Sequence, residues 1–490
     1  MSRKLKILLA ASEVFPFAKT GGLGDVSGSL PKALHALGHD VRIIMPGHQS
    51  AFSSGSDICF LGRQVDISIG KKTQRGIFFQ TYLKKNIPVY LVGNEEYYQR
   101  DGIYGDSGGD YSDNAERFIF FCRSVPEACK ALAFQPDIIH CNDWHTGLIP
   151  AYLKTLYDED WFADTRTVFT THNLGYQGNF PASEFDLTHL PGDLFTPGGL
   201  EFYGQLSFLK SGLQYSDLLT TVSPSYSQEI QTDECGFGME DIIRERAEDL
   251  HGILNGIDLE EWNPERDPFI KEQYSPKNLE NKSTCKEELI RIFSLKVDAD
   301  TPILGMVSRL AAQKGIELVL DAVIQLLEDG AAFVLLGMGD PIYENRLREI
   351  QKRHPEKIGV TLGYDEKLSH QIIAGSDLVM MPSQYEPCGL TQMYGLKYGT
   401  VPLVRSVGGL KDSIQEFNPT TLQGIGFTFK PFESQYLLGA WKEALSVYRQ
   451  KSLWKKLVQN GMAEDNSWQK AANKYFRIYE KALEKNSGVK

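Results

Sequence analysis

One short stretch of the chain combines a residue that can hold hydroxyl groups with a turn that can hold phosphates. An apolar strand over 377–381 is followed by a polar loop, which leads into a helix. The residues of this loop and helix start that could contact a ligand are Glu386, Cys388, Gly389, Leu390 and Thr391. The first amides of a helix lack helical acceptors and attract anions without any metal. A nucleotide sugar carries both hydroxyls and phosphates and fits this stretch.

A second loop gathers positive charge in a chain that is acidic overall. The predicted strand 302–307 is followed by Arg309 and Lys314. A guanidinium presents a planar pair of donors to a pyrophosphate, and a lysine adds a point charge. Because the formal net charge is -12, an anionic substrate needs such a local concentration of cations. On this loop alone, two solvated surface charges remain the alternative.

A glycine-rich loop follows the first predicted strand, 6–11, and carries Lys19. Its glycines, and those of the helix behind it, are Gly21, Gly22, Gly24 and Gly28. The spacing of Gly22, Gly24 and Gly28 is GxGxxxG instead of GxGxxG, and the second strand, 41–45, does not end in the acid that would hold a ribose. A nicotinamide enzyme is therefore disfavoured. An amide-rich loop that approaches phosphates is the main interpretation, and a tight turn with a surface lysine is the alternative.

Two more predicted strands, 137–141 and 167–171, end in polar residues. The polar side chains there are His140, Asp143, His145 and His172. They lack a constrained spacing such as HxxxH, so a metal site is disfavoured. Binding of substrate hydroxyls at the strand ends is the favoured interpretation. The tyrosines of the loop 95–104, Tyr98 and Tyr104 among them, either stack on sugar rings or simply pack.

The elements around these sites alternate between strand and helix in both halves of the chain. This alternation predicts an α/β protein with two doubly wound, Rossmann-like domains that face each other across a cleft. We expect an N-terminal domain over 1–262, a C-terminal domain over 263–466, and a last helix within 467–490 that crosses back to the N-terminal domain. Residues 263–268 are predicted to be a linker and hinge. The lysine-rich tail after residue 483 is expected to be disordered.

The composition is that of a soluble globular protein, and it disfavours some classes of binding partner. A chain of 490 residues exceeds what one hydrophobic core usually supports. Acidic charge disfavours nucleic acid and anionic membranes, no apolar run reaches membrane-spanning length, and the run 7–11 is too short for a signal peptide. The 7 cysteines form no CxxC pair, which favours reduced thiols in the cytoplasm. An oligomer is compatible with the sequence.

Taken together, these residues resemble the bacterial glycogen synthases and plant starch synthases, which are retaining glycosyltransferases of the two-domain GT-B fold. The similarity runs from residue 6 to about residue 483. Its most specific segments are 19–26, 172–173, 255–258, 309–315 and 386–392. The family implies transfer of glucose from ADP-glucose to the non-reducing end of an α-1,4-glucan. It also implies that neither a metal nor pyridoxal phosphate is required.

The resemblance also implies a role for individual positions. The catalytic residues would be Glu386, Arg309, Lys314 and His172. The donor-binding residues would be Lys19, Gly21, Gly22, Asn255, Tyr364, Cys388, Gly389, Leu390 and Thr391. The acceptor-binding residues would be Glu13, Tyr98, Tyr104 and Asp143. In this scheme the cations neutralise the leaving diphosphate, Tyr364 stacks on the nucleobase, and Glu386 holds glucose hydroxyls.

One difference from other GT-B enzymes indicates which branch of these glycosyltransferases the chain resembles. Many retaining relatives have a second glutamate eight positions after the first, but the residue eight positions after Glu386 is Tyr394. This favours the starch and glycogen synthases over sucrose or lipid-sugar enzymes. No residue decides between an ADP and a UDP donor. The rival hypotheses are a phosphorylase, which would need lysine-bound pyridoxal phosphate, and a non-catalytic glucan-binding protein, which would not need the phosphate-neutralising cations.

Overall fold

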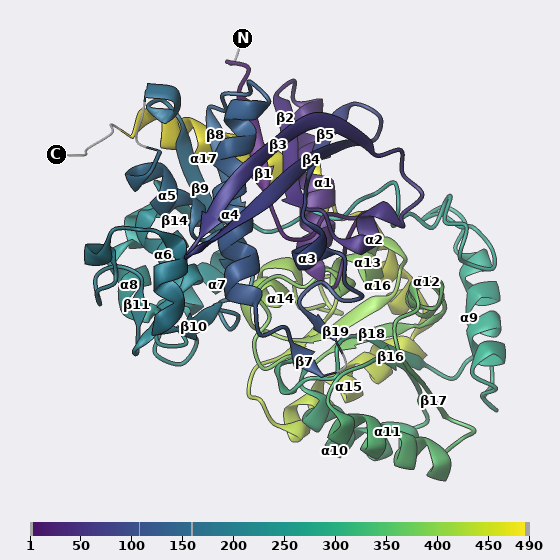
Figure 1. Cartoon of the computed structure of the whole chain (residues 1–490). Coiled ribbons are helices and arrows are strands. Elements are labelled where there is room, and N and C mark those ends of the chain that lie inside the picture. Colours follow the sequence, from purple (N-terminus) through teal and green to yellow (C-terminus); the bar gives the residue numbers. More distant parts are fainter. Residues whose placement is uncertain (1–2, 107, 158–159, 486–490) are drawn as a thin grey trace. The chain divides into compact units, whose positions relative to one another are not determined.

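The computed structural model of the protein describes residues 3–106, 108–157 and 160–485, and these form two α/β units (Figure 1). Unit 1 comprises Met1–Val222, Ser227–Ile253 and Trp468–Lys490, and unit 2 comprises Ser223–Tyr226 and Leu254–Ser467. Each unit contains a largely parallel sheet with helices that follow its strands, which confirms the predicted fold class. The lysine-rich tail, 486–490, lies outside the described residues.

Unit 1 is built on a nine-stranded sheet in the order β14-β13-β9-β8-β1-β2-β5-β4-β3. Its strands are β1 (Lys6–Ala10), β2 (Asp40–Pro46), β3 (Cys59–Ile69), β4 (Lys72–Leu83), β5 (Ile87–Gly93), β8 (Ile138–Asn142), β9 (Arg166–Thr171), β13 (Leu218–Thr221) and β14 (Leu250–Gly252). Strands β14 to β5 pair in parallel, while β5, β4 and β3 pair antiparallel. The apolar run of β1 and the burial of every residue of β8 suit strands that are covered on both faces.

The helices of unit 1 include the last helix of the chain. They are α1 (Gly22–Ala36), α2 (Gln49–Phe52), α3 (Glu95–Tyr98), α4 (Asn114–Ala131), α5 (Ile149–Thr155), α6 (Phe208–Tyr215), α8 (Glu240–Glu245) and α17 (Trp468–Glu484), and α7 (Pro224–Glu229) begins in the part assigned to unit 2. Five short strands complete the unit, β6 (Gly105–Asp106), β7 (Gly109–Asp110), β10 (Asn179–Pro181), β11 (Glu201–Phe202) and β12 (Gln205–Ser207). Helix α17 packs against α1 and buries Tyr475 and Tyr479 in the same core as β1.

Unit 2 is a parallel six-stranded sheet in the order β17-β16-β15-β18-β19-β20. Its strands are β15 (Ile303–Val307), β16 (Ala332–Gly337), β17 (Ile358–Leu362), β18 (Leu378–Met381), β19 (Val401–Arg405) and β20 (Phe427–Phe429). Its helices are α9 (Glu280–Ile292), α10 (Ile316–Glu328), α11 (Pro341–Arg353), α12 (Glu366–Gly375), α13 (Thr391–Lys397), α14 (Gly408–Ser413), α15 (Ser434–Arg449) and α16 (Lys451–Met462). Because β15 and β18 are neighbours, the loops that follow them leave the same edge of the sheet.

The segment expected to be a linker, 263–268, is instead anchored within unit 2. Asp267 is 1% exposed, and its carboxylate accepts hydrogen bonds from Tyr398 at 2.6 Å and from the His370 ring at 2.7 Å. A buried carboxylate with such donors fixes the backbone that carries it. Among the residues that the structure describes, no helix is long and apolar enough to cross a membrane.

Candidate functional site

In unit 2, a buried carboxylate and a lysine meet where two neighbouring strands end. Glu386 follows β18 and is 4% exposed, and its Oε2 lies 2.6 Å from the ammonium of Lys314, which follows β15. Ser383 donates a second hydrogen bond to the same oxygen at 2.9 Å. The structure therefore brings together two residues that the sequence predicted for one site, and it does so through an ion pair.

A glycine allows these two loops to approach. Gly315 has a φ of 70°, and a Cβ on it would lie 2.1 Å from the carbonyl oxygen of Pro382, so a side chain here would require the loops to separate. The backbone amide of Gln384 donates to the carbonyl of Gln313 at 2.8 Å. The positions of Lys314 and Glu386 are thus set by backbone contacts as well as by their own charges.

Two further predicted residues of unit 2 are exposed. The guanidinium of Arg309 lies just after β15 and donates to Gln313 Oε1 at 3.3 Å. The ring of Tyr364 follows β17 and is 71% exposed. Strands β15 and β17 are parallel and are separated by β16, so the planar cation and the flat ring lie at the same edge of the sheet, where α/β sheets bind ligands. Both side chains are accessible to a substrate.

The loop around Cys388 is held tightly and contains neutral polar groups. The amide of Gly409 donates to the carbonyl of Glu386 at 3.0 Å, and a Cβ on Gly409 would lie 2.2 Å from the carbonyl oxygen of Cys388. Burial raises the pKa of the Cys388 thiol to about 12, so the thiol is neutral at pH 7. Asn255 is 6% exposed, and its Oδ1 has no hydrogen-bond partner among the described residues.

The remaining donor residues predicted here lie at the start of a short helix. Gly389, with a φ of 70°, precedes α13, and a Cβ on it would lie 2.5 Å from the side-chain oxygen of Gln392. Leu390 is the N-cap of the helix, and Leu390 and Thr391 are both half-buried. The helix predicted after the glycine turn is therefore present, and it begins at Thr391.

In unit 1, Glu13 organises the glycine loop. Its carboxylate accepts hydrogen bonds from the Thr20 amide at 2.5 Å, the Thr20 hydroxyl at 2.7 Å and the Gly21 amide at 3.2 Å. Tyr104 donates to it as well, at 2.6 Å. Glu13 is 3% exposed, so in this structure it is buried and stabilises the loop through these hydrogen bonds. Contact of Glu13 and Tyr104 with an acceptor stays a prediction.

The loop itself presents backbone and one cation. Gly21 is half-buried and Gly22 is exposed, and a Cβ on Gly21 would meet nothing within 4 Å. The ammonium of Lys19 lies 2.6 Å from a carboxylate oxygen of Asp25. The loop thus has an accessible backbone that could approach phosphates, as predicted from the sequence. Its lysine, Lys19, is paired with Asp25 in this structure.

The strand ends of unit 1 hold a carboxyl and an imidazole whose titration is shifted by burial. Burial raises the pKa of the Asp143 carboxyl to about 7, although hydrogen bonds from the backbone of His172 and Asn173 oppose the shift. Burial lowers the pKa of the His172 imidazole to about 3. Its Nε2 lies 2.9 Å from the Asn142 side-chain oxygen. His172 is therefore neutral at pH 7, and Asp143 changes charge close to pH 7, as groups at functional sites often do.

Three other polar residues of unit 1 lie in its core. His140 has both ring nitrogens engaged, by Tyr479 at 2.9 Å and by Thr170 at 2.6 Å. The ring of His145 is buried and stacks on Tyr104, with centroids 4.6 Å apart. Tyr98 is 1% exposed and donates to the carbonyl of Arg117 at 2.9 Å. Of the two readings of the tyrosine loop, packing describes Tyr98 in this structure.

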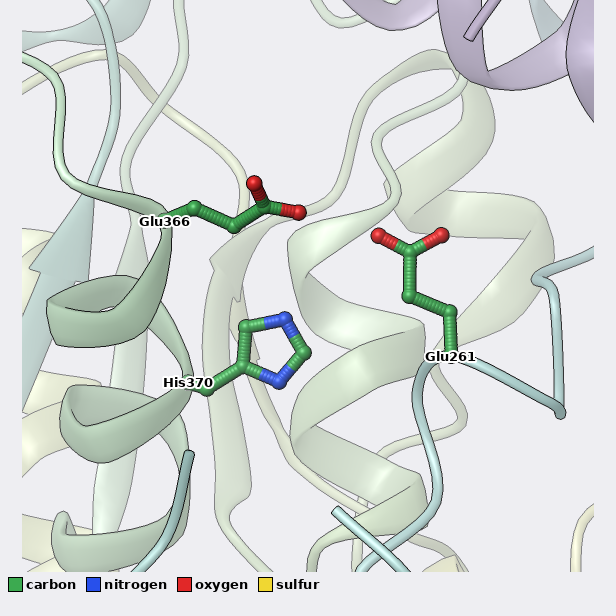
Figure 2. Close-up of side chains that lie close together, drawn as sticks. All are labelled: Glu261, Glu366 and His370. Atoms are coloured by element: carbon green, nitrogen blue, oxygen red, sulfur yellow. The ribbon is translucent and has the colours of Figure 1, made fainter. Parts of the chain in front are cut away.

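Sequence reasoning missed one cluster, which lies in unit 2. Among the described residues, one group of acidic and histidine side chains is close enough to hold a metal ion, namely Glu261, Glu366 and His370 (Figure 2). Its ligand atoms all lie within 4.8 Å of one another. The spacing of Glu366 and His370, four residues apart on α12, was the available signal. The partner, Glu261, is too distant in sequence to be paired with them by pattern.

The chain matches two family models. Residues 6–245 match the starch synthase catalytic domain, and residues 289–461 match the glycosyl transferases group 1. A glycogen synthase of Syntrophotalea carbinolica is 48% identical over 481 residues, which covers 98% of this chain and 99% of the relative. A glycogen synthase of Thermotoga maritima is 43% identical over 488 residues, which covers 98% of this chain and 99% of that relative.

Solved structures agree with these relatives. The catalytic domain of starch synthase IV from Arabidopsis thaliana, bound to ADP and acarbose, superposes with a TM-score of 0.91 at 33% identity, and the match covers 98% of this chain and 100% of that one. The sucrose-phosphate synthase of Thermosynechococcus elongatus gives a TM-score of 0.60 at 16% identity, and the match covers 98% and 99%. The second likeness concerns the fold alone.

Proposed function

Since the chain belongs to the family of bacterial glycogen synthases and starch synthases, we propose that it transfers glucose from ADP-glucose to the non-reducing end of an α-1,4-glucan with retention of configuration. The observation that carries this proposal is the full-length match to glycogen synthases, combined with the paired Lys314 and Glu386 beside the exposed Arg309. ADP as the donor nucleotide is supported by the related starch synthase, which was solved with ADP and acarbose.

The reaction separates a cationic sugar from an anionic diphosphate. In this proposal the bond from the glucose C1 to the diphosphate breaks while the acceptor 4-hydroxyl attacks C1 from the same face. The departing phosphate oxygen takes the proton of that hydroxyl. Arg309 and Lys314 interact most strongly when negative charge has developed on the diphosphate, so they stabilise the transition state more than the bound substrate.

The other residues hold the sugar and the nucleotide. Glu386 and Asn255 accept hydrogen bonds from glucose hydroxyls, and the unpartnered Oδ1 of Asn255 supports this role. The exposed ring of Tyr364 stacks on the nucleobase. His172, which is neutral at pH 7 because burial lowers its pKa to about 3, serves as a hydrogen-bonding group next to the reacting carbon and not as a cation.

Residues of unit 1 complete the proposed substrate contacts. Lys19 and the amides of Gly21 and Gly22 contact the donor phosphates. Tyr104 and Asp143 lie on the acceptor side, and Glu13 acts there through its hold on the glycine loop. The amides of Leu390 and Thr391, beside Cys388 and Gly389, complete the donor set in unit 2. We assign Tyr98 no direct contact, since its ring is buried.

The proposal requires no metal ion and no pyridoxal phosphate, because the charge on the leaving group is met by side chains. Its substrates are a nucleotide sugar and an α-glucan, and nucleic acid and membrane play no part. We place the enzyme in the cytoplasm, which the pattern of cysteines favours. An oligomeric state is compatible with all of these features.

The test is the initial rate of glucan extension with ADP-glucose and with UDP-glucose, on glycogen, in the presence of EDTA. We expect a strong preference for ADP-glucose and a rate that EDTA leaves unchanged. A preference for UDP-glucose would overturn the donor assignment and keep the chemistry. If neither sugar were transferred and the protein absorbed light in the pyridoxal phosphate band, the phosphorylase alternative would replace the proposal.

A further inference from the structure

We propose that Glu261, Glu366 and His370 of unit 2 form a binding site for one divalent transition-metal ion, best matched by Zn²⁺. The three side chains converge on one point, with the two carboxylates on either side of the imidazole edge (Figure 2). None of the three is among the residues assigned to sugar transfer. The site is therefore a structural addition to a reaction that uses no metal.

Two of the ligands come from one turn of helix α12. Glu366 and His370 are four residues apart, so their side chains lie on the same face of the helix. The start of α12 is fixed by Asp365, whose side chain accepts a hydrogen bond from the Leu368 amide at 2.9 Å. The spacing between these two ligands is thereby set before any ion binds.

A buried carboxylate sets the tautomer of the histidine. His370 Nδ1 lies 2.7 Å from Asp267 Oδ2, which also accepts a hydrogen bond from Tyr398 at 2.6 Å. With a proton on Nδ1, the lone pair of the neutral ring is on Nε2. Metal-binding histidines regularly donate their other nitrogen to a carboxylate in this manner. Asp267 is therefore in the position of a supporting residue behind the metal ligand.

The second nitrogen of His370 is available and points into the cluster. His370 is 1% exposed, and its Nε2 has no hydrogen-bond partner among the described residues. Figure 2 shows the upper ring nitrogen directed towards the two carboxylates. A buried polar atom without a partner costs free energy, and a metal ion at this point would satisfy it.

Aromatic stacking holds the ring in its plane. Trp262 lies over His370 with centroids 3.8 Å apart and an interplanar angle of 12°. Trp262 also stacks on Tyr394, with ring centroids 3.8 Å apart and an interplanar angle of 7°. Since Glu261 directly precedes Trp262, the same stack also positions the third ligand. A site with locked ligands is preorganised for an ion.

The choice of ion follows from ligand type and spacing. Bonds of about 2.1 Å in a tetrahedral zinc site separate the ligand atoms by roughly 3.4 Å, whereas here they lie within 4.8 Å of one another. Small rotations of the half-buried glutamates would close this gap. An imidazole with two carboxylates favours zinc or a similar transition metal over Mg²⁺ and Ca²⁺, which prefer oxygen ligands. A water molecule would complete the coordination.

The experiment uses the full chain, stripped of metal and carrying C59S, because Cys59 is an exposed thiol that would compete for the probe. Co²⁺ is added while visible d–d absorption and Trp fluorescence are followed. We expect one Co²⁺ per chain, quenching of Trp262, and displacement by Zn²⁺ but not by millimolar Mg²⁺. A higher melting temperature should accompany binding.

The variant E261Q/E366Q keeps the shape of both side chains and should weaken Co²⁺ binding by at least about tenfold. The matched control is E287Q/E349Q, which also replaces two glutamates, one exposed on α9 and one exposed on α11, and should bind Co²⁺ as before. H370N is a second variant, to be read only if its melting temperature shows that it folds.

Absence of stoichiometric d–d absorption, or equal affinity in E261Q/E366Q and its control, would overturn the site. Equal displacement by Mg²⁺ would overturn the assignment to a transition metal. Glucan extension is measured on the same samples, and its loss in the stripped protein would count against the metal-free reaction rather than against this site. The two proposals therefore fail separately.

Discussion

The proposed site residues of the two units differ in how they carry charge. In unit 2 four of them are ionic or exposed: Lys314 is paired with Glu386, and Arg309 and Tyr364 are open to solvent. In unit 1 the corresponding groups are largely buried and hydrogen-bonded, with a neutral His172 at pH 7. In the proposed reaction, unit 2 therefore supplies most of the charge that stabilises the departing diphosphate, and unit 1 contributes Lys19 and mainly orientation. Substitutions in unit 2 should therefore affect rate or donor binding, with a loss of stability where the side chain is paired and buried, and substitutions in unit 1 should mainly affect stability.

The largest effect is expected for Arg309→Ala. Loss of one preorganised donor to a developing oxyanion lowers the turnover by about 10²–10³-fold, and because Arg309 is exposed the melting temperature should hardly change. The measurements are kcat/KM with ADP-glucose and thermal unfolding. Arg353→Ala, an exposed arginine on α11, is the control and should leave both unchanged. If Arg309→Ala also lowered the melting temperature, Arg309 would not be an exposed residue that affects the rate alone.

Lys314→Ala should lose stability as well as rate. Glu386 is 4% exposed, and removal of its partner leaves a buried charge, which costs about 3–5 kcal/mol. The double variant K314A/E386Q should regain much of the unfolding free energy but none of the activity. Chemical denaturation and initial rates of both variants decide this. Recovery of activity in the double variant would show that Lys314 serves only to neutralise Glu386.

Tyr364→Ala should weaken donor binding and little else. Stacking of a base on an aromatic ring contributes about 1–3 kcal/mol, so KM for ADP-glucose should rise about tenfold while kcat stays nearly constant. Tyr364→Phe keeps the stacking face and should behave as the wild type. An unchanged KM for Tyr364→Ala would remove the nucleobase role from this residue.

The smallest effect on turnover is expected in unit 1, for Asp143→Asn, whose main effect is on stability. Burial raises the pKa of Asp143 from 3.8 to about 7, so the folded protein holds this proton more tightly than the unfolded chain. Stability therefore falls between pH 4 and pH 7, and above pH 7 the whole penalty is present. The variant should melt higher than the wild type at pH 8, and the gap should close near pH 4. A gap that does not vary with pH would contradict the shifted pKa.

Much of the fold and of the unit 2 site could be predicted, because both depend on local patterns. Apolar strands followed by helices predicted the two sheets, and loops at the ends of parallel strands had to share an edge. The resemblance to the glycogen and starch synthases placed Lys314 and Glu386 in one site, and the structure pairs them. The two loops meet because β15 and β18 are neighbouring parallel strands of the sheet.

What could not be predicted depends on contacts between distant residues. Tyr98 looked like a sugar-binding loop residue, yet its ring fills the core beside the buried Arg117. Residues 263–268 have the composition of a linker, but the hydrogen bonds that Asp267 accepts come from residues more than a hundred positions away. Likewise, Ser223 joins unit 2 through the carbonyl of Pro387, at 2.7 Å. No periodicity encodes such pairings.

The packing of helix α17 into unit 1 has a consequence for the order of events on the ribosome. Tyr475 and Tyr479 belong to the core of unit 1, yet they are synthesised after the whole of unit 2. Until they emerge, the nascent chain presents the apolar side of β1 and leaves His140 without the hydroxyl that lies 2.9 Å from its Nδ1. Unit 1 therefore completes its folding last although most of it is translated first, and its unfinished core is a surface that chaperones can bind during translation.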